Sequence, residues 1–381
     1  MSQMNKIVFL TGATGLVGGN LIPRILKDPN AIRLILLVRG SSDREAEQRV
    51  NEMLGTLSPE IENDQAKRRI QVVCGDITLD KLGLAENLYN RLAEEVTHVI
   101  HSAATVQFQL PLECARLVNC TGTENVMTLA HCAQKTGHLK QVAYVSTAYV
   151  AGDREGLILE TELDYGQQFS NTYERTKLEA EKIVHRWMSE LPITIFRPSI
   201  IVGNSQTGRT TAFNVLYPPL KLIQRDLIRV LPGSENTPLD VVPVDFVADT
   251  IDHIFLKTEQ GIGKTYHLTA GEENSTTAGE VVDSAVDYFN KAGGNLHRVQ
   301  FMPVERYHKA ERSLLGHERR IWQAMERYES YISVNRMFDN GNACSALRGS
   351  EITAPDFGTY FHAILGYCLQ TDWGKRLKVA A

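Results

Sequence analysis

Residues 7–19 read Ile-Val-Phe-Leu-Thr-Gly-Ala-Thr-Gly-Leu-Val-Gly-Gly, an apolar run that leads into a glycine-rich turn. A stretch of helical character follows directly, so the predicted order is strand, turn, helix. Regularly spaced glycines allow a tight turn and a close approach to a pyrophosphate, which the free N–H groups of the helix N-terminus bind. A flexible loop is the alternative, but the position between strand and helix favours a dinucleotide site. Its predicted contacts are Thr11, Gly12, Thr14, Gly15, Leu16, Val17 and Gly18.

A second apolar run, residues 34–38, predicts the next parallel strand, and Arg39 follows it. An acidic residue at this point would bond the ribose 2′-hydroxyl of NAD, whereas an arginine suits the additional phosphate of NADP. Ser41 and Arg44 lie close by in the sequence. We therefore predict NADP(H) as the cofactor, with Arg39 as a contact; an ordinary exposed arginine after a strand is the alternative.

Two further apolar runs, residues 70–73 and 98–101, predict the third and fourth strands. Asp76 follows the third strand, where a carboxylate can accept a hydrogen bond from the adenine amino group, and Ile77 is predicted beside it. After the fourth strand come small residues that let the backbone pass close to the cofactor. These are Ser102, Ala103 and Ala104.

His98 and His101 on the fourth strand raise the question of a metal site. The two side chains point to opposite faces of the predicted strand. The sequence places no cluster of cysteines or carboxylates beside them, so we predict no bound metal.

A fifth strand, residues 141–145, leads into Ser146 and Thr147, whose hydroxyls can reach a substrate oxygen. Tyr173 and Lys177 lie four residues apart in a stretch that favours helix, so both project from one face. A phenol has a pKa of about 10, and a nearby ammonium group is expected to lower it. The pair alone would fit a solvated helix face, but together with the glycine turn it predicts a proton donor beside the cofactor.

The alternation of strands and helices predicts an α/β fold, a doubly wound parallel sheet of the Rossmann type. A smaller, mainly helical substrate lobe is expected after it. The predicted nucleotide domain covers residues 1–204 and about 239–293, and the lobe covers about 205–238 and 294–381. Within the lobe, residues 308–328 predict one amphipathic helix, which serves the core, an acyl channel or a dimer face.

The whole-chain composition excludes several classes of protein. The 381 residues carry a formal net charge of −5 with scattered lysines and arginines, so no nucleic-acid surface is expected. No apolar run approaches the ~20 residues of a transmembrane helix. Residues 1–6 show no cleavable apolar leader, and the six cysteines form no Cys-x-x-Cys pair. We expect a cytoplasmic protein with reduced thiols.

These motifs together resemble the extended short-chain dehydrogenase/reductase superfamily. Residues 101–108 (His-Ser-Ala-Ala-Thr-Val-Gln-Phe) and 145–152 (Val-Ser-Thr-Ala-Tyr-Val-Ala-Gly), with the stretch 191–201, look most like fatty acyl-CoA reductases and thioester reductase domains. The C-terminal region of alcohol-forming acyl reductases is usually longer than the one present here. The resemblance implies a fold, a cofactor and a set of catalytic positions.

In the family a hydroxyl residue, a tyrosine and a lysine perform catalysis. The resemblance assigns these roles to Tyr173, Lys177 and either Ser146 or Thr147, with the register of the Tyr-Val-Ala-Gly string favouring Thr147. Asn119 matches the asparagine that supports the lysine through water. Tyr173 and Lys177 are also implied cofactor contacts, as are three residues after a later strand. These are Pro198, Ser199 and Ile200.

The implied activity is NADPH-dependent reduction of an acyl thioester, carried on CoA or on an acyl carrier protein, to an aldehyde. Further reduction to the alcohol stays open. The alternatives are a superfamily member acting on a ketone, a sterol or a nucleotide sugar, and a protein that senses NADP(H) without catalysis. Members of the superfamily often dimerise, so a homodimer is one expectation.

Overall fold

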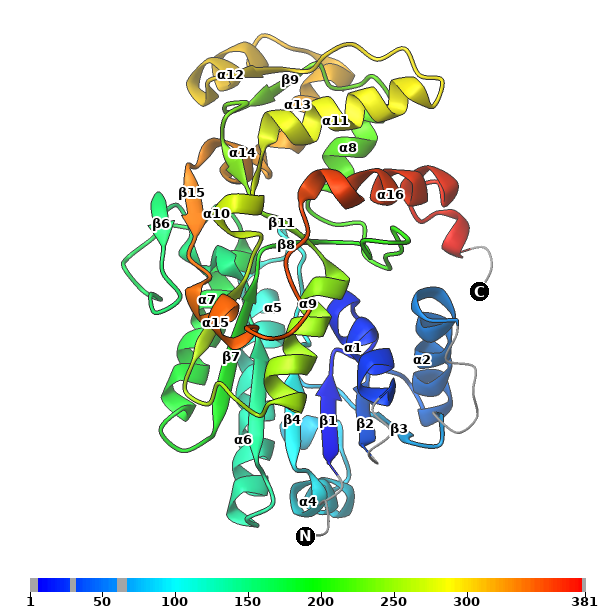
Figure 1. Cartoon of the computed structure of the whole chain (residues 1–381), viewed down its shortest axis with the longest axis vertical. Helices are drawn as coiled ribbons and strands as arrows, with labels where there is room; N and C mark the ends of the chain where they lie inside the picture. The colour runs from blue at the N-terminus through cyan, green and yellow to red at the C-terminus, as the bar shows by residue number, and fades with distance from the viewer. Residues whose placement is uncertain (1–5, 28–31, 60–66, 379–381) are drawn as a thin grey trace.

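A seven-stranded parallel sheet forms the centre of the computed structural model, which describes residues 6–27, 32–59 and 67–378 (Figure 1). The strand order is β12-β7-β5-β4-β1-β2-β3, so the predicted doubly wound parallel sheet is confirmed. The strands are β1 (Ile7–Thr11), β2 (Arg33–Val38), β3 (Ile70–Cys74), β4 (His98–His101), β5 (Gln141–Val145), β7 (Ile193–Pro198) and β12 (Thr265–Leu268).

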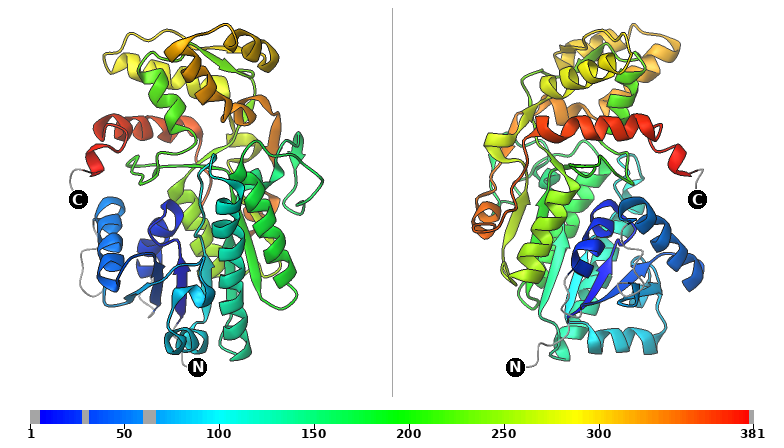
Figure 2. Two further views of the ribbon diagram at one scale, coloured as in Figure 1. Left: turned by 180° about the vertical axis from the view of Figure 1, so that it is seen from behind. Right: turned by 45° about the vertical axis from the view of Figure 1, so that its right-hand side comes forward.

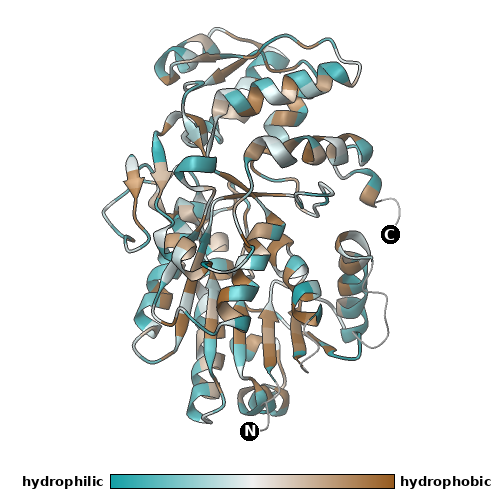
Figure 3. Ribbon diagram, viewed as in Figure 1, coloured by the Kyte–Doolittle hydropathy of each residue, from teal (hydrophilic) through white to brown (hydrophobic). Residues whose placement is uncertain are grey.

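The strands are apolar because both faces of the sheet are covered. Figure 3 shows the central strands largely in brown, the colour of hydrophobic residues. β1 lies between β2 and β4, with Leu10 opposite Leu36 on one side and Ile100 on the other. The chain therefore leaves the sheet in opposite directions after β1 and β4. Open parallel sheets bind ligands at such a reversal, outside the carboxyl ends of the strands.

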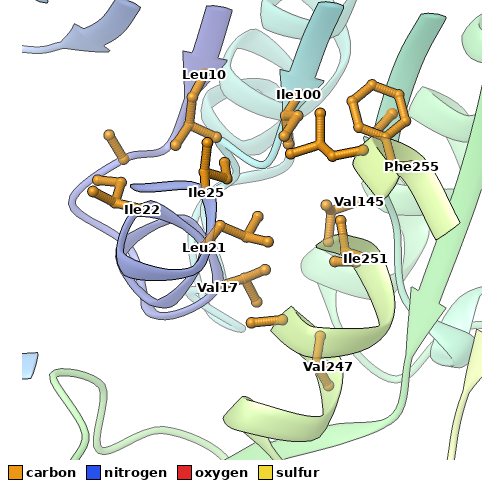
Figure 4. Packing of buried hydrophobic residues seen from close by; sticks show 14 of the residues in the cluster. Leu10, Val17, Leu21, Ile22, Ile25, Ile100, Val145, Val247, Ile251 and Phe255 are labelled. Atoms are coloured by element: carbon orange, nitrogen blue, oxygen red, sulfur yellow. The ribbon is translucent and has the colours of Figure 1, made fainter. Parts of the chain in front are cut away.

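One face of the sheet is covered by three helices and a π-helical turn. Leu21 and Ile25 of the first helix pack against Ile251 and Phe255 beneath the sheet (Figure 4). Each such buried side chain stabilises the fold by about 1.5–3 kcal/mol. The elements are α1 (Leu16–Lys27), α2 (Asp43–Leu57), α9 (Val244–Ile251) and η4 (Asp252–Lys257).

The other face is covered by α4 (Glu86–Glu95), α6 (Gly122–Lys135) and α7 (Thr172–Trp187). α7 begins where it does because the side chain of Asn171 accepts a hydrogen bond from the backbone N–H of Glu174 and caps the helix. This start places Tyr173 in the first turn, near the carboxyl ends of the strands. The short helix α5 (Leu112–Arg116) and a π-helical turn, η2 (Leu117–Thr121), lead into α6.

The lobe lies beyond the carboxyl ends of the strands (Figures 1 and 2). Its helices gather around two apolar clusters. They are α8 (Tyr217–Gln224), α11 (Ala278–Lys291), α12 (Val304–Glu311), α13 (Gly316–Glu326), α14 (Glu329–Ser333) and α16 (Phe357–Gln370). Within it, β9 (Val230–Pro232) pairs with β14 (Gln300–Met302), and β10 (Pro238–Leu239) pairs with β13 (Thr276–Thr277).

The chain passes back and forth between the sheet and the lobe. β8 (Ile200–Val202) pairs with β11 (Val241–Pro243) below the lobe, and β6 (Gly156–Ile158) pairs with β15 (Arg336–Phe338). α15 (Gly341–Ala346) then packs beside β12 before the chain returns to the lobe as α16. α11, which the sequence placed with the nucleotide domain, packs against α8 and α16. We propose that the domain boundary lies near residue 277 rather than 293.

The prediction of one helix over residues 308–328 is wrong. α12 ends at Glu311 and α13 begins at Gly316, whose φ of 59° breaks the helical path. The two helices instead pack on each other, with Tyr307 stacked on Trp322 at a ring-centroid distance of 4.2 Å.

A membrane-spanning helix is not found in the part of the chain that the structure describes, because none of its helices combines the necessary length with the necessary hydropathy.

Candidate active site

A cavity of about 200 Å³ opens at the carboxyl ends of β1 to β4, where the strand order reverses. Most of the predicted cofactor contacts line it. They are Thr11, Gly12, Thr14, Gly15, Arg39, Asp76, Ile77, Ser102, Ala103 and Ala104. Leu16, Val17 and Gly18 begin α1 behind the turn and do not line this cavity. The other predicted contacts that do not line it are Tyr173, Lys177, Pro198, Ser199 and Ile200.

The glycines of the turn are required by close packing. A Cβ on Gly12 would lie 2.6 Å from the backbone nitrogen of Ala103, and Gly12 has a φ of 75°. A Cβ on Gly18 would lie 2.3 Å from the carbonyl oxygen of Gly12. The turn therefore lies tightly against β4 and against the start of α1, as a dinucleotide pyrophosphate requires.

Two arginines lie at the outer end of the cavity. Arg39 is exposed and follows β2 as predicted, whereas Arg49 of α2 was missed by the sequence analysis. The Arg49 guanidinium donates a hydrogen bond to the backbone carbonyl oxygen of Arg39, and both residues line the cavity. The sequence pattern that could have indicated Arg49 is a basic residue about two turns into the helix that follows the second strand. Asp76 faces the same cavity and accepts hydrogen bonds from the backbone and side chain of Thr78.

Tyr173 lies in the first turn of α7, with its hydroxyl near the side chain of Thr147. Burial raises the pKa of Tyr173 to about 12, although the nearby Thr147 hydroxyl lowers it. The sequence predicted that Lys177 lowers the pKa of Tyr173, and this prediction is wrong. The Lys177 Nζ instead donates to the Tyr144 hydroxyl at 2.8 Å and to the Val145 carbonyl oxygen at 2.9 Å.

Lys177 itself is 3 % exposed. Burial lowers its pKa to about 8, while the carboxylate of Glu181, one turn further along α7, opposes that shift. The side chain thus carries a positive charge at neutral pH and loses it in mildly alkaline solution.

The two candidate hydroxyls after β5 have different surroundings. Ser146 donates to Glu181, and that carboxylate also holds the guanidinium of Arg197 at 2.5 Å. Ser146 is therefore part of a buried ionic cluster. Thr147 faces Tyr173, and its Oγ1 accepts a hydrogen bond from the Tyr149 backbone at 3.2 Å. Of the two, the geometry brings Thr147 to the tyrosine.

Asn119 lies in the π-helical turn η2, where the backbone bulges toward α7. Its Nδ2 donates to Thr176 at 2.9 Å and to the Thr105 carbonyl oxygen at 3.2 Å. Its Oδ1 accepts a hydrogen bond from the Thr105 backbone at 2.8 Å. The side chain therefore ties the loop after β4 to α7.

The three predicted residues at the end of β7, Pro198 to Ile200, each have different contacts. Thr147 approaches the carbonyl oxygen of Pro198 at 3.4 Å. Ser199 donates to Asp240, a buried carboxyl whose pKa is raised to about 6 by desolvation. Ile200 lines an apolar cavity in the lobe.

An aromatic row that the sequence analysis missed joins Tyr173 to that apolar cavity. The Phe108 ring stacks on Tyr173 at 6.1 Å and on Tyr331 at 5.8 Å. Tyr331 and Tyr328 both line the cavity, together with aliphatic side chains of α8 and α11. No short-range pattern could reveal this row, because its members come from distant parts of the chain.

A model of the male sterility protein family, an NAD-binding family, matches residues 10–251, a range that contains the glycine turn, Thr147, Tyr173 and Lys177. The chain belongs to the male sterility protein family. This membership, within the extended short-chain dehydrogenase/reductases, indicates a reductase that uses a nicotinamide cofactor.

Two curated relatives are similar to this chain over different shares of their own lengths. Aldehyde reductase lnaA of Aspergillus flavus is 30% identical over 269 residues, which is 68% of this chain and 25% of the fungal protein. Fatty acyl-CoA reductase wat of Drosophila melanogaster is 27% identical over 282 residues, which is 66% of this chain and 54% of the Drosophila protein. The chain thus spans between a quarter and about half of these relatives.

Among solved structures, the terminal R domain from the myxalamid PKS-NRPS biosynthetic pathway resembles the chain with a TM-score of 0.79 at 27% identity. The match covers 98% of this chain and 93% of that domain. The family likeness therefore extends through the lobe as well as the nucleotide half.

Proposed function

We propose that the protein reduces an acyl thioester to an aldehyde with NADPH. The observation that carries the proposal is the meeting of Thr147, Tyr173 and Lys177 at the carboxyl end of β5, between a dinucleotide crevice and an apolar cavity. The names of the two curated relatives, an aldehyde reductase and a fatty acyl-CoA reductase, support the same class of reaction.

The roles of the catalytic residues follow from their chemistry. A nicotinamide cofactor held in the crevice by the glycine turn would supply a hydride to the carbonyl carbon. Thr147 and Tyr173 donate hydrogen bonds to the carbonyl oxygen, where negative charge develops, and Tyr173 transfers its proton to it. The resulting hemithioacetal then releases the thiol as the aldehyde forms.

Lys177 and Asn119 act in support of the tyrosine. The ammonium of Lys177 is held at the Val145 carbonyl oxygen at the end of β5, where it would bind the nicotinamide ribose as the superfamily resemblance implies. Asn119 holds the loop at Thr105 against α7 through Thr176. Ser146 stabilises the Glu181 cluster rather than the reacting atoms.

The cofactor preference rests on Arg39 and Arg49. Both line the crevice after β2, where the adenosine ribose of a dinucleotide would bind, and Arg39 rather than a carboxylate directly follows the strand. Two guanidinium groups bind a phosphate better than a free hydroxyl. This favours NADP(H) over NAD(H).

The acyl group is proposed to enter the cavity lined by Ile200, Leu220, Val282 and Tyr331. The lining side chains are almost all aliphatic or aromatic, so an unbranched hydrocarbon chain fits better than a sugar or a charged group. Pro198, Ser199 and Ile200 then lie where the nicotinamide and the acyl group meet.

Product analysis tests the function. The protein is incubated with NADPH and a series of acyl thioesters on CoA and on an acyl carrier protein, beside a panel of ketones and nucleotide sugars. The expected products are aldehydes, or alcohols after a second reduction, identified by mass spectrometry. Oxidation of NADPH with a ketone or sugar but with no thioester would overturn the proposal.

A further inference from the structure

Lys177 lies against a second tyrosine, Tyr144 on β5, which the sequence analysis did not single out. Its Nζ donates a hydrogen bond to the Tyr144 hydroxyl at 2.8 Å and lies 4.4 Å from the centre of the same ring. A second hydrogen bond from Nζ reaches the backbone carbonyl oxygen of Val145 at 2.9 Å. Two successive residues of β5 therefore hold the ammonium group at the carboxyl end of the strand.

The alternation of side chains along β5 places Tyr144 on the side of the sheet from which Lys177 comes. Ala143 and Val145 belong to the apolar cluster that includes residues of α1 and α9. Tyr144, in contrast, belongs to the cluster that includes residues of α4, α6 and α7. Since Lys177 projects from α7, Tyr144 is the last residue of β5 whose side chain lies on its side of the sheet.

Burial makes these contacts of the ammonium group necessary. Tyr144 is 1 % exposed and Lys177 is 3 % exposed. A buried ammonium group destabilises the fold unless hydrogen bonds replace those that it makes with water. Of its three N–H donors, Tyr144 and Val145 engage two, and the described residues provide no further acceptor. One N–H is left for a ribose hydroxyl of the nicotinamide, the contact that the superfamily resemblance implies.

The hydroxyl of Tyr144 suits a cation because it is neutral. Burial raises the pKa of Tyr144 well above its ordinary value, so the group stays protonated. Its oxygen accepts the hydrogen bond from Nζ, and the face of its ring attracts the same positive charge. A phenylalanine would fill the same space and would provide the ring alone. Packing therefore does not require the hydroxyl.

Glu181 is the charged group that acts on Lys177 from its own helix. Burial lowers the pKa of Lys177 to about 8, and the ionised Glu181 opposes that shift. This carboxylate is itself engaged by Ser146 and by Arg197, the latter at 2.5 Å. Within the part of the chain that the structure describes, Lys177 thus forms no ion pair, and the two oxygens on β5 hold it directly.

The other titratable groups around Lys177 come from α7, η2 and β4, and they are uncharged at neutral pH. Burial raises the pKa of Tyr173 on α7 and of Cys120 on η2 to about 12. Burial lowers the pKa of His101 on β4 to about 3, so its ring is neutral. A change in the charge of Lys177 between pH 7 and pH 9 therefore belongs to the lysine itself.

We propose that Tyr144 is a positioning residue that, with the Val145 carbonyl oxygen, fixes the ammonium group of Lys177 where a nicotinamide ribose would bind. The inference rests on the proposed function, because it takes Lys177 to contact a nicotinamide cofactor. Tyr144 acts through Lys177 and not on the reacting atoms. A hydrogen bond to the charged form favours that form, so loss of the hydroxyl should make the lysine lose its proton at a lower pH.

Tyr144→Phe tests the proposal, because it keeps the ring and removes the hydrogen-bond acceptor. NADPH is titrated by fluorescence at a series of pH values on both sides of the lysine pKa. Binding to the wild type should weaken as the pH rises through about 8, where Lys177 loses its charge. In Tyr144→Phe this midpoint should fall by about one pH unit, and binding below it should weaken about fivefold.

Tyr266→Phe is the matched control. Tyr266 is also 1 % exposed and lies on β12 of the same sheet, where its ring stacks on Phe196 at 5.7 Å. Neither the affinity for NADPH nor the midpoint should change in this variant. An unchanged midpoint in Tyr144→Phe, with or without weaker binding, would mean that the hydroxyl does not act on the charge of Lys177, and it would overturn the proposal.

Lys177→Met separates an effect through the lysine from an effect on the fold. The transition near pH 8 should be absent from this variant, since the ammonium group is gone. Adding Tyr144→Phe should then weaken NADPH binding by less than about twofold, because no ammonium group is left to position. A larger additional loss would mean that Tyr144 supports the fold by itself, and it would overturn the proposal.

A measurement on the wild type keeps the test decisive if Tyr144→Phe does not fold. In protein with isotope-labelled lysine side chains, the nuclear magnetic resonance signal of Lys177 is identified by its absence from Lys177→Met. It should titrate near pH 8 and show a nuclear Overhauser effect to the ring protons of Tyr144. Titration at the ordinary lysine value of about 10.4, or the lack of that effect, would overturn the proposal.

The outcomes separate this inference from the proposed function. The measurements follow NADPH binding or the lysine signal, so none of them requires turnover. A protein that binds NADPH with the expected pH dependence but reduces no thioester would contradict the proposed function and leave the role of Tyr144 intact. Reduction of thioesters together with an unchanged midpoint in Tyr144→Phe would overturn only the inference about Tyr144.

Discussion

The dinucleotide crevice and the apolar cavity of the lobe are built in opposite ways. In the crevice half, side chains such as Lys177, Glu181 and Asn119 are each held by two or more hydrogen bonds. In the cavity, residues such as Val282 and Leu220 are positioned by shape alone. Chemistry needs oriented charges and donors, whereas selection among hydrocarbon chains needs volume. Substitutions in the two regions should therefore fail in different ways.

Tyr173→Phe should have the largest effect on the crevice side. It removes the proton donor and leaves the ring stacked on Phe108, so kcat should fall by about 10²–10⁴. Fluorescence titration with NADPH should show nearly unchanged binding. Wild-type turnover in this variant would refute the assignment of Tyr173.

Glu181→Gln should show how much the buried ionic cluster contributes to the stability of the fold. It leaves the buried Arg197 guanidinium without its counter-charge, which should lower the free energy of unfolding by about 3–5 kcal/mol. Urea unfolding measures this. Glu179→Gln, on the same helix but paired with Arg116 near the surface, should lower it by less than about 1 kcal/mol. Similar losses in both variants would contradict the comparison.

The same cluster predicts a pH dependence of stability. Burial works against the charged form of Glu181, yet Arg197, His185 and Ser146 together hold its pKa at about 2 in the folded chain, against 4.5 as the ordinary value. The unfolded chain binds more protons between these values, so the stabilisation is complete above about pH 4.5 and is lost toward pH 2. In Glu181→Gln the free energy of unfolding should change less between pH 4.5 and pH 2 than in the wild type, as urea unfolding at several pH values would measure.

Val282→Phe should change selectivity while leaving the chemistry intact. The larger side chain enters the cavity, so KM for the longest acyl thioesters should rise about tenfold, while the shortest remain unaffected. Val286→Phe is the control, because Val286 is equally buried one turn along α11 but does not line the cavity. Identical chain-length profiles for the two variants would exclude the cavity as the acyl site.

The smallest expected effect concerns the arginines at the outer end of the crevice. Arg49→Gln should weaken NADPH binding by about fivefold, equivalent to about 1 kcal/mol, and leave NADH binding unchanged. Arg44→Gln on the same helix should change neither, since Arg44 does not line the crevice. Equal losses for both cofactors in Arg49→Gln would argue against recognition of the 2′-phosphate.

The same contrast explains what the sequence predicts. Buried parallel strands are continuous apolar runs, and the glycine turn and the Tyr173–Lys177 spacing are local patterns, so these could be read directly. Ser146 and Thr147 could not be separated, because that choice depends on Glu181, 35 residues away. Phe108, Arg49 and Tyr331 join the site through tertiary packing. The break at Gly316 was missed because its neighbours continue a helical pattern.

The repeated passage of the chain between the sheet and the lobe limits how the protein can open. β8 and β11, β6 and β15, and α15 beside β12 brace the two halves at separate points. A lid that swings on one hinge would have to break several of these pairings at once. We therefore expect substrate entry to depend on small rotations of side chains such as Phe108. Protease nicking of one connecting loop should leave the fragments associated until a denaturant is added.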